Sequence, residues 1–191
     1  MKKLKLAIFA SGNGSNAEAI IQHLNNHSTI AVAAIYSNNS KAYVLERAKN
    51  YGISATTFTK DEFFHANFND HLLKAGYDLI VLAGFMWLVP PAIVASFNKK
   101  IINIHPALLP KYGGKGMYGH FVHQAVVNNK EKESGITIHY VNDRYDEGDI
   151  IFQAKCAVHK TDTPDLLADR IHILEHRHYP SIIEKICTNK S

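Results

Sequence analysis

A regular alternation of short apolar runs and helix-like stretches constrains the fold of this chain more than any other feature. Two of the helix-like stretches are followed by a glycine, Gly52 and Gly76, the usual residue after a helix C-terminus. Strand and helix in turn predict an α/β fold with a mostly parallel sheet covered by helices on both faces. The expected strands are 4–10, 30–36, 53–58, 78–84 and 101–104, and the expected helices are 17–24, 42–51, 61–74 and 90–97.

The last third of the chain departs from this rhythm. After a helix expected at 120–127, residues 135–141 alternate between apolar and polar, and 150–158 return as a second strand beyond an acidic turn. Two strands joined in this way predict an antiparallel hairpin at the end of the sheet. A long helix then begins at Pro164, and we expect it to break near Pro180.

Charge and cysteine content argue against several classes of protein. The formal net charge is only +4, and the densest basic cluster is Lys2, Lys3 and Lys5, so we expect no nucleic-acid partner. Cys156 and Cys187 predict neither a disulfide scaffold nor a cysteine-based zinc site. The first apolar run, of about seven residues, is too short for a secretory signal, and no stretch is long enough to span a membrane. We therefore expect a soluble, cytoplasmic protein.

Asn103 and His105 are the most suggestive pair of polar residues in the chain. Because Pro106 cannot donate to a strand ladder, His105 should lie where the strand becomes a loop. Residues two apart on an extended chain point to the same face. An amide that holds an oxyanion, beside an imidazole that moves a proton, suits a reaction at a carbonyl carbon. The alternative is a polar pair that merely lines a loop.

The segment Ser11-Gly12-Asn13-Gly14-Ser15-Asn16 predicts an anion site at a helix N-terminus. Free backbone N–H groups and the helix dipole converge at such a turn, and Ser15 and Asn16 can cap the helix or add donors. The glycine spacing also fits the looser dinucleotide fingerprint, which expects an acid at the end of the second strand. The chain has Ser37-Asn38-Asn39-Ser40 there. We therefore favour a phosphate-binding loop over a dinucleotide site, with a plain tight turn as the third interpretation.

Three further segments carry open interpretations. Residues 85–89 form either part of the core or a slot for a flat heteroaromatic ligand. The glycine-rich segment 113–119 predicts a mobile loop beside His105 that could close over a ligand. A carboxylate such as Asp146, if it met His105, would favour the imidazolium and raise its pKa.

Two histidine pairs, His120 with His123 and His172 with His176, have spacings that a metal ion could use. Neither pair has a third ligand of the right type nearby in the sequence. We therefore expect no metal site.

Four motifs together resemble the formyltransferase family. They are Ser-Gly-Asn-Gly-Ser-Asn at 11–16, Ala-Gly-Phe-Met at 83–86, Asn-Ile-His-Pro-Ala-Leu-Leu-Pro-Lys at 103–111, and the later Asp146. The first motif narrows the likeness to the folate-dependent phosphoribosylglycinamide formyltransferases. The resemblance implies one Rossmann-like domain over residues 1–188, and transfer of the formyl group of 10-formyltetrahydrofolate to the amine of phosphoribosylglycinamide in purine biosynthesis. It implies small-molecule substrates, no metal, and a monomer or homodimer.

The same resemblance implies roles for individual residues. The catalytic residues would be Asn103, His105 and Asp146. Gly14, Ser15 and Asn16 would hold the phosphate, Glu175 would contact the ribose hydroxyls, and Arg170 would help with the phosphate. Met86, Trp87, Leu88, Val89, Asn103 and Val141 would line the folate pocket.

The chain departs from the family pattern on the folate side. Trp87 stands where many members carry arginine, segment 113–119 differs from the commoner Pro-Gly-x-His version, and 59–70 offers no arginine for the folate glutamate. Two other functions stay open at this point. One is a different formyltransferase or a formyltetrahydrofolate hydrolase, whose members carry a further domain. The other is a nucleotide-binding module without catalysis.

Overall fold

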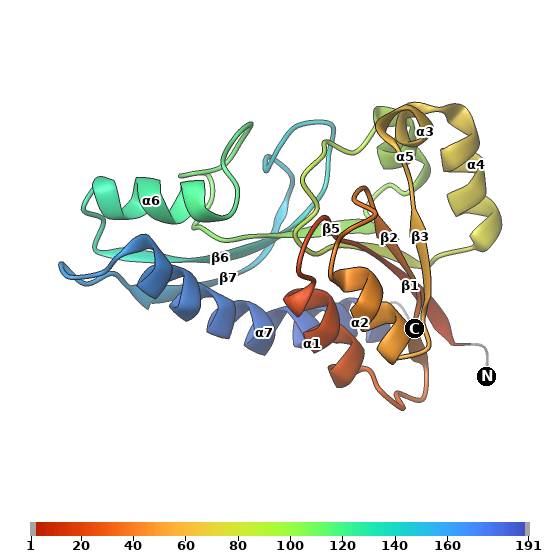
Figure 1. The fold of residues 1–191 in the computed structure, drawn as a ribbon, viewed down its shortest axis with the longest axis horizontal. Helices are drawn as coiled ribbons and strands as arrows, with labels where there is room; N and C mark the ends of the chain where they lie inside the picture. Colours follow the sequence, from red (N-terminus) through yellow and green to blue (C-terminus); the bar gives the residue numbers. More distant parts are fainter. Residues whose placement is uncertain (1–2, 190–191) are drawn as a thin grey trace.

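A computed structural model describes residues 3–189, so Lys2 of the N-terminal lysine cluster lies outside the described residues. Seven strands form one sheet in the order β3-β2-β1-β4-β5-β6-β7 (Figure 1). The strands are β1 (Leu4–Phe9), β2 (Ile30–Ser37), β3 (Ser54–Thr57), β4 (Leu79–Leu82), β5 (Ile101–His105), β6 (Glu133–Tyr140) and β7 (Ile150–Ala157). The helices are α1 (Ser15–His23), α2 (Val44–Asn50), α3 (Lys60–Phe64), α4 (Ala66–Ala75), α5 (Pro91–Ser96), α6 (His120–Asn128) and α7 (Pro164–Thr188).

The sheet has the predicted mixed character. The first five strands pair in parallel, whereas β6 is antiparallel to both β5 and β7. The prediction of a parallel sheet ending in an antiparallel hairpin is therefore confirmed. The strand order reverses between β1 and β4, and in such sheets ligands bind beyond the carboxyl ends of the strands at this point.

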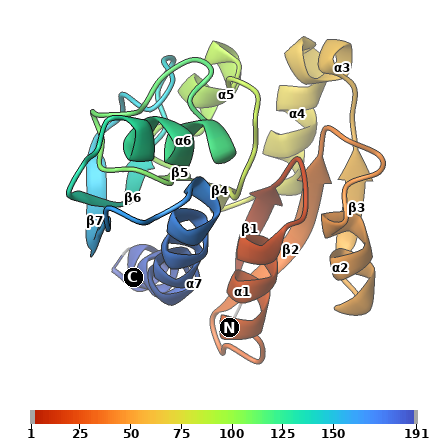
Figure 2. The same ribbon diagram turned by 60° about the vertical axis from the view of Figure 1, so that its left-hand side comes forward.

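Alternating residues of the strands pack into two separate hydrophobic cores, one on each face of the sheet. Leu6 and Ile8 of β1 join the cluster that contains Ile20 of α1 and Ile183 of α7, whereas Phe9 joins an aromatic cluster on the other face. Figures 1 and 2 show α1, α2 and α7 together below the sheet, with α3, α4 and α5 above it. Because side chains of a strand alternate between faces, a parallel strand needs apolar residues at nearly every position.

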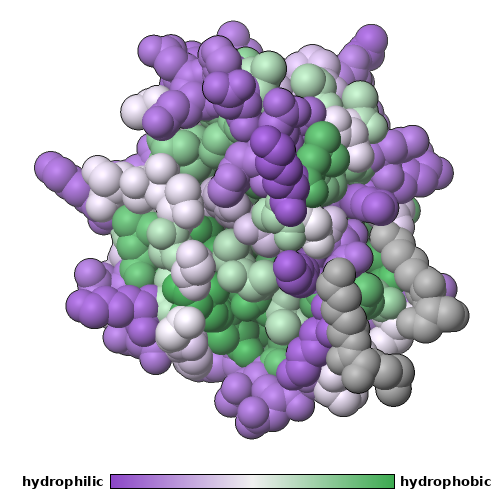
Figure 3. All heavy atoms as spheres, turned by 90° about the vertical axis from the view of Figure 1, so that its right-hand side faces the viewer, coloured by the Kyte–Doolittle hydropathy of each residue, from purple (hydrophilic) through white to green (hydrophobic). Residues whose placement is uncertain are grey.

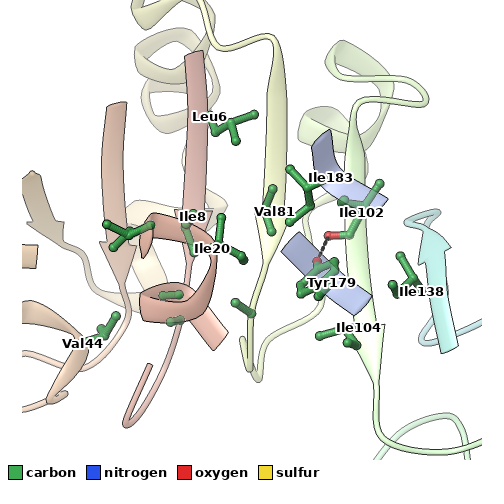
Figure 4. Close-up of a cluster of buried hydrophobic side chains, with 14 of the residues drawn as sticks. Leu6, Ile8, Ile20, Val44, Val81, Ile102, Ile104, Ile138, Tyr179 and Ile183 are labelled. Atoms are coloured by element: carbon green, nitrogen blue, oxygen red, sulfur yellow. Dashed lines mark hydrogen bonds between the residues drawn. The ribbon is translucent and has the colours of Figure 1, made fainter. Parts of the chain in front are cut away.

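Tyr179 ties the first of these cores to the strand ends (Figure 4). Its ring is fully buried, and its hydroxyl lies 2.9 Å from the carbonyl oxygen of Leu82 and 3.3 Å from that of Ile102. Those carbonyls belong to the last residue of β4 and to the residue before Asn103. Helix α7 therefore holds β4 and β5 together next to the carboxyl ends, where a site is expected.

Two helix predictions were wrong. The expected helix 61–74 is interrupted at His65, whose extended backbone ends α3 and begins α4, and whose ring accepts the Asn67 N–H. The expected break at Pro180 does not occur, because α7 continues through this residue to Thr188. Proline removes one backbone donor from a helix, but Pro180 and Ile183 are buried in the core, and that packing outweighs the loss.

The face of the molecule shown in Figure 3 has hydrophilic side chains around its margin and hydrophobic residues gathered near its centre. Edge strand β3 is short and exposed along its length, with small and hydroxyl-bearing residues only. Short polar edge strands limit pairing with other chains. Within residues 3–189, no helix combines the length and the apolar character needed to cross a membrane.

Candidate active site

Strands β5 and β6 place four polar side chains on one face of the sheet. In the antiparallel register, Asn103 lies opposite His139, and His105 lies opposite Thr137. The alternating apolar residues of both strands, Ile102, Ile104, Ile136 and Ile138, point into the core on the other face. Asn103 Nδ2 lies 3.2 Å from His139 Nε2. The predicted common face for Asn103 and His105 therefore exists, and β6 adds a second histidine to it.

Asp146 reaches this group from the turn between β6 and β7. Its Oδ2 lies 3.5 Å from His105 Nδ1, and its Oδ1 lies 3.6 Å from His139 Nε2 and 3.5 Å from Asn103 Nδ2. The Gly114 N–H donates to Oδ2 at 2.9 Å. Asp146 is thus the common neighbour of the two histidines and the amide, and its backbone has a positive φ of 58°.

The expected rise in the pKa of His105 does not occur. Burial of the imidazole lowers its pKa below the usual value, and this outweighs the opposite effects of the Asp146 charge and the Tyr112 carbonyl. For Asp146, burial acts to raise the pKa, but contacts with His139, His105 and the Gly114 N–H leave it lowered. At neutral pH the site therefore holds an ionised Asp146 beside a neutral His105. His105 Nε2 lies 2.7 Å from the Tyr112 carbonyl oxygen, which can only accept, so Nε2 carries the proton.

The loop after β1 begins helix α1 at Gly14, which has a φ of 77°. A Cβ at this position would lie 2.4 Å from Val44 Cγ2, so both the turn and the packing against α2 need glycine. Ser15 and Asn16 are the first residues of α1, and no side chain caps the helix, so the capping role suggested for them is wrong. The first turn keeps free N–H groups, as an anion site requires.

Arg47 of α2 fixes the shape of this loop. Its Nε donates to the Asn13 carbonyl at 2.9 Å and its guanidinium to Asn13 Oδ1 at 2.8 Å, and it also pairs with Glu18. Ser11 connects the loop to the next one, since its Oγ accepts the Met86 N–H at 3.0 Å. The loops after β1 and β4 are therefore joined directly.

Asn16 and Glu175 meet at the same end of the site. Asn16 Nδ2 donates to Glu175 Oε2 at 2.9 Å, across 159 residues of sequence. Glu175 is only 6% exposed, and burial raises the pKa of its carboxyl group. The carboxyl group keeps further acceptor capacity for hydroxyl groups of a ligand.

The segment after β4 forms an apolar wall, and the interpretation of residues 85–89 as part of the core is correct for some of them, whereas the ligand slot stays a prediction. Val89 is buried in the aromatic core, and Trp87 packs against Phe58 and Phe63 at centroid distances of 6.0 Å. Met86 is 43% exposed. The Leu88 N–H donates to the Tyr145 hydroxyl at 3.1 Å, which joins this wall to the turn that carries Asp146.

One cavity of about 660 Å³ is lined by the polar group around Asp146, the loop after β1, Glu175 and the apolar wall. It takes in the loop after β1, the apolar wall, the end of β5, segment 114–119, and one side of α7. The predicted site residues that line it are Gly14, Ser15, Asn16, Met86, Trp87, Leu88, Val89, Asn103, His105, Val141, Asp146 and Glu175. A volume of this size suits a small-molecule ligand or a pair of them.

Arg170 does not line this cavity, although it lies on the same helix as Glu175. Its guanidinium donates to both Asp162 carboxylate oxygens, at 2.8 and 3.1 Å, and to the Ala157 carbonyl at 2.7 Å. The Arg170 hydrogen bonds hold the pKa of Asp162 at about 2. Because residues five apart on a helix differ in direction by more than a quarter turn, Arg170 and Glu175 serve different sides of α7.

Replacing Arg170 with methionine is expected to lower the free energy of unfolding by about 1–3 kcal/mol, because Asp162 and the Ala157 carbonyl lose their partner. The KM for a ligand bound at the loop after β1 should not change, because Arg170 does not line the cavity. Urea denaturation and steady-state kinetics measure the two quantities. A rise in KM with no loss of stability would show instead that Arg170 contributes to ligand binding. The folded-state pKa of Asp162 is depressed, so its stabilising effect is present above about pH 4 and is lost as the pH falls towards 2.

Sequence reasoning missed four contributors to this site: His139, Tyr145, Arg47 and the Gly114 N–H. A usable signal existed only for His139, which alternates with Thr137 on the polar face of a strand. The other three act through contacts between segments that are distant in sequence.

Within residues 3–189, no group of three or more histidine, cysteine or acidic side chains is arranged to hold a metal ion.

The chain is similar to known proteins along most of its length. A family model described as formyl transferase matches residues 4–183. The chain is 39% identical to the chloroplastic phosphoribosylglycinamide formyltransferase of Arabidopsis thaliana, over 99% of this chain and 67% of that protein. It is 36% identical to the phosphoribosylglycinamide formyltransferase of Escherichia coli (strain K12), over 94% of this chain and 85% of that protein.

Solved structures give the same result. The crystal structure of phosphoribosylglycinamide formyltransferase from Anaplasma phagocytophilum has a TM-score of 0.89 and 34% identity, covering 99% of this chain and 88% of that chain. The crystal structure of glycinamide ribonucleotide transformylase 1 from Symbiobacterium toebii has a TM-score of 0.88 and 32% identity. The match covers 98% of this chain and 89% of that chain. The likeness therefore includes the sheet, the hairpin and the segments that line the cavity.

Proposed function

The chain belongs to the formyl transferase family, and from this premise we propose that it transfers the formyl group of 10-formyltetrahydrofolate to the amine of N1-(5-phosphoribosyl)glycinamide, in purine biosynthesis. The observation that carries the proposal is the convergence of Asn103, His105 and Asp146 inside one cavity. One end of that cavity offers an anion-binding helix terminus and the other an apolar wall, which suits a phosphorylated sugar and a flat heteroaromatic ring.

In this mechanism the substrate amine attacks the formyl carbon, and negative charge develops on the formyl oxygen. Asn103 donates its amide N–H to that oxygen and stabilises the charge. His105, neutral at rest, takes the proton that the new ammonium nitrogen must lose, directly or through a water molecule. Asp146 stabilises the imidazolium that forms. His105 then returns the proton to N10 of the folate as the carbon–nitrogen bond breaks, so protons balance without a metal ion or a covalent enzyme intermediate.

The cavity also aligns the two substrates. Gly14, Ser15 and Asn16 would hold the phosphate at the N-terminus of α1, and Glu175 would accept hydrogen bonds from ribose hydroxyls. The apolar wall from Met86 to Val89, together with Val141, would hold the folate ring. Holding two reactants in register can supply a large share of a rate enhancement.

A two-substrate assay tests the proposed function. Glycinamide ribonucleotide and a 10-formyl folate analogue are mixed with the protein, and release of the deformylated folate is followed by absorbance. We expect turnover only when both substrates are present. Folate release without the ribonucleotide would identify a hydrolase instead, and no turnover from folded protein would favour a binding module.

The pH dependence of kcat/KM tests the protonation state of His105. Because its pKa is lowered and the neutral form accepts the proton, we expect activity to be retained at pH 7 and to fall below pH 6.5. Asp146→Asn should move this acid limb to lower pH as well as reducing the rate, because the carboxylate acts to raise the pKa of His105. A loss of activity above pH 6.5 would mean instead that the imidazolium is the resting form.

We also propose that residues 1–188 form a single domain acting in the cytoplasm as a monomer or homodimer, without a nucleic-acid partner. The single sheet supports the single-domain assignment, and the low net charge supports the assignment without a nucleic-acid partner. Size-exclusion chromatography with light scattering measures the oligomeric state directly.

A further inference from the structure

His123 of α6 is a buried residue that the proposed mechanism does not use. Its side chain is only 4% exposed, and it lines the same cavity as His105 and Glu175. Its Nδ1 is buried without a hydrogen-bond partner among the described residues. A buried polar atom without a partner costs about 1–3 kcal/mol, so such an atom beside a binding cavity calls for a ligand group.

Two of the titratable groups that act on His123 also line the cavity. The titratable groups that act on His123 are His172, His120, His105 and Asp165. His172 also lines the cavity and in turn acts on Glu175. His123 therefore lies within electrostatic range of the proposed proton-transfer residue, His105, and of His172, which is on the same helix as Glu175.

The chemistry of the ring indicates what it would bind. Burial and the neighbouring histidines lower the pKa of His123 to about 4, so the ring is neutral at pH 7. A neutral imidazole offers one donor and one acceptor, which match a hydroxyl or amide group. An ionised phosphate offers acceptors only. Asn16, another residue that lines this cavity, also has a buried acceptor without a partner, its Oδ1.

We propose that His123 is a further substrate-binding residue, which hydrogen-bonds a hydroxyl or amide group in the middle of the ribonucleotide, between its phosphate and its reacting amine. The inference rests on the proposed function. It assigns His123 to substrate positioning rather than to proton transfer, and to the ribonucleotide rather than to the folate.

The test compares His123→Leu with wild type in direct binding of glycinamide ribonucleotide by calorimetry. We expect affinity to fall about tenfold or more, because the ligand group loses its partner inside the cavity. The KM for the formyl folate should not change. The melting temperature should be unchanged or higher, because leucine removes a buried polar atom that had no partner. His123→Asn, which keeps a donor and an acceptor, should retain part of the affinity.

His120→Leu is the matched control. His120 lies on the same helix, but its side chain is 59% exposed and does not line the cavity. Ribonucleotide affinity equal to wild type in His123→Leu, or a loss of the same size in His120→Leu, would overturn the inference. Failure of the wild type itself to bind the ribonucleotide would instead overturn the proposed function.

Two smaller probes identify the group that His123 contacts. Weaker binding of ribose 5-phosphate to His123→Leu would support the inference and locate the contact at the ribose hydroxyls. Unchanged ribose 5-phosphate binding with weaker ribonucleotide binding would support it and locate the contact at the glycinamide amide. Weaker binding of inorganic phosphate would contradict it, because the contact would then be to the phosphate.

Discussion

Replacing His105 with alanine is expected to lower kcat by about 10²–10⁴-fold, the range for loss of a positioned proton-transfer group. The ring is 4% exposed, donates to the Tyr112 carbonyl through Nε2, and presents Nδ1 to Asp146. Alanine removes the proton acceptor and leaves Asp146 without the imidazolium that it would stabilise. The measurement is kcat with both substrates saturating, supported by a thermal melt that shows the variant to be folded.

Four further measurements make the result for His105→Ala interpretable. The KM for the ribonucleotide should change little, because the phosphate loop and Glu175 do not contact His105. His120→Ala serves as the control, since this histidine lies outside the cavity lining. Asn103→Ala should lower kcat by about 10²–10³-fold as a lost oxyanion donor, and the double variant should lose less than the product of the two single effects. A loss smaller than tenfold in His105→Ala would contradict the proposed mechanism.

Replacing Gly14 with alanine is expected to lower the free energy of unfolding by about 2–5 kcal/mol and to abolish tight binding of the ribonucleotide. The estimate combines about 1–2 kcal/mol for a left-handed backbone with about 1–3 kcal/mol for overpacking. The added methyl group would lie 2.4 Å from Val44 Cγ2, so relief requires α1 and α2 to separate. That movement would displace the N–H groups that hold the phosphate.

Gly52→Ala separates the two contributions. Gly52 has a comparable φ of 65°, but a Cβ there meets no atom within 4 Å, and the residue does not line the cavity. It should therefore show the backbone effect alone, with normal ribonucleotide affinity. Urea denaturation and calorimetry on both variants measure the difference. Equal stability losses in the two would show that contact with Val44 contributes nothing.

Predictions from the sequence succeeded where short-range rules apply. Hydrophobic runs such as Leu79–Leu82 predict buried parallel strands, because both faces of such a strand need apolar side chains. The period of two placed Asn103 and His105 on one face. The glycine-containing loop predicted a helix N-terminus, which begins one residue after Gly14. The two helix errors were also local in origin, since His65 and Pro180 have backbone preferences that neighbouring contacts settled in opposite ways.

The sequence by itself determined the type of sheet, the position of the loops at its carboxyl edge, and the chemical identity of the polar residues there. Only the tertiary structure decided which of those residues meet. It turned Arg170 towards Asp162, brought His139 and Asp146 to Asn103, and joined Asn16 to Glu175. It also decided the charge of His105, because the pKa of an imidazole depends on burial as well as on its neighbours, and burial is a property of the packed molecule.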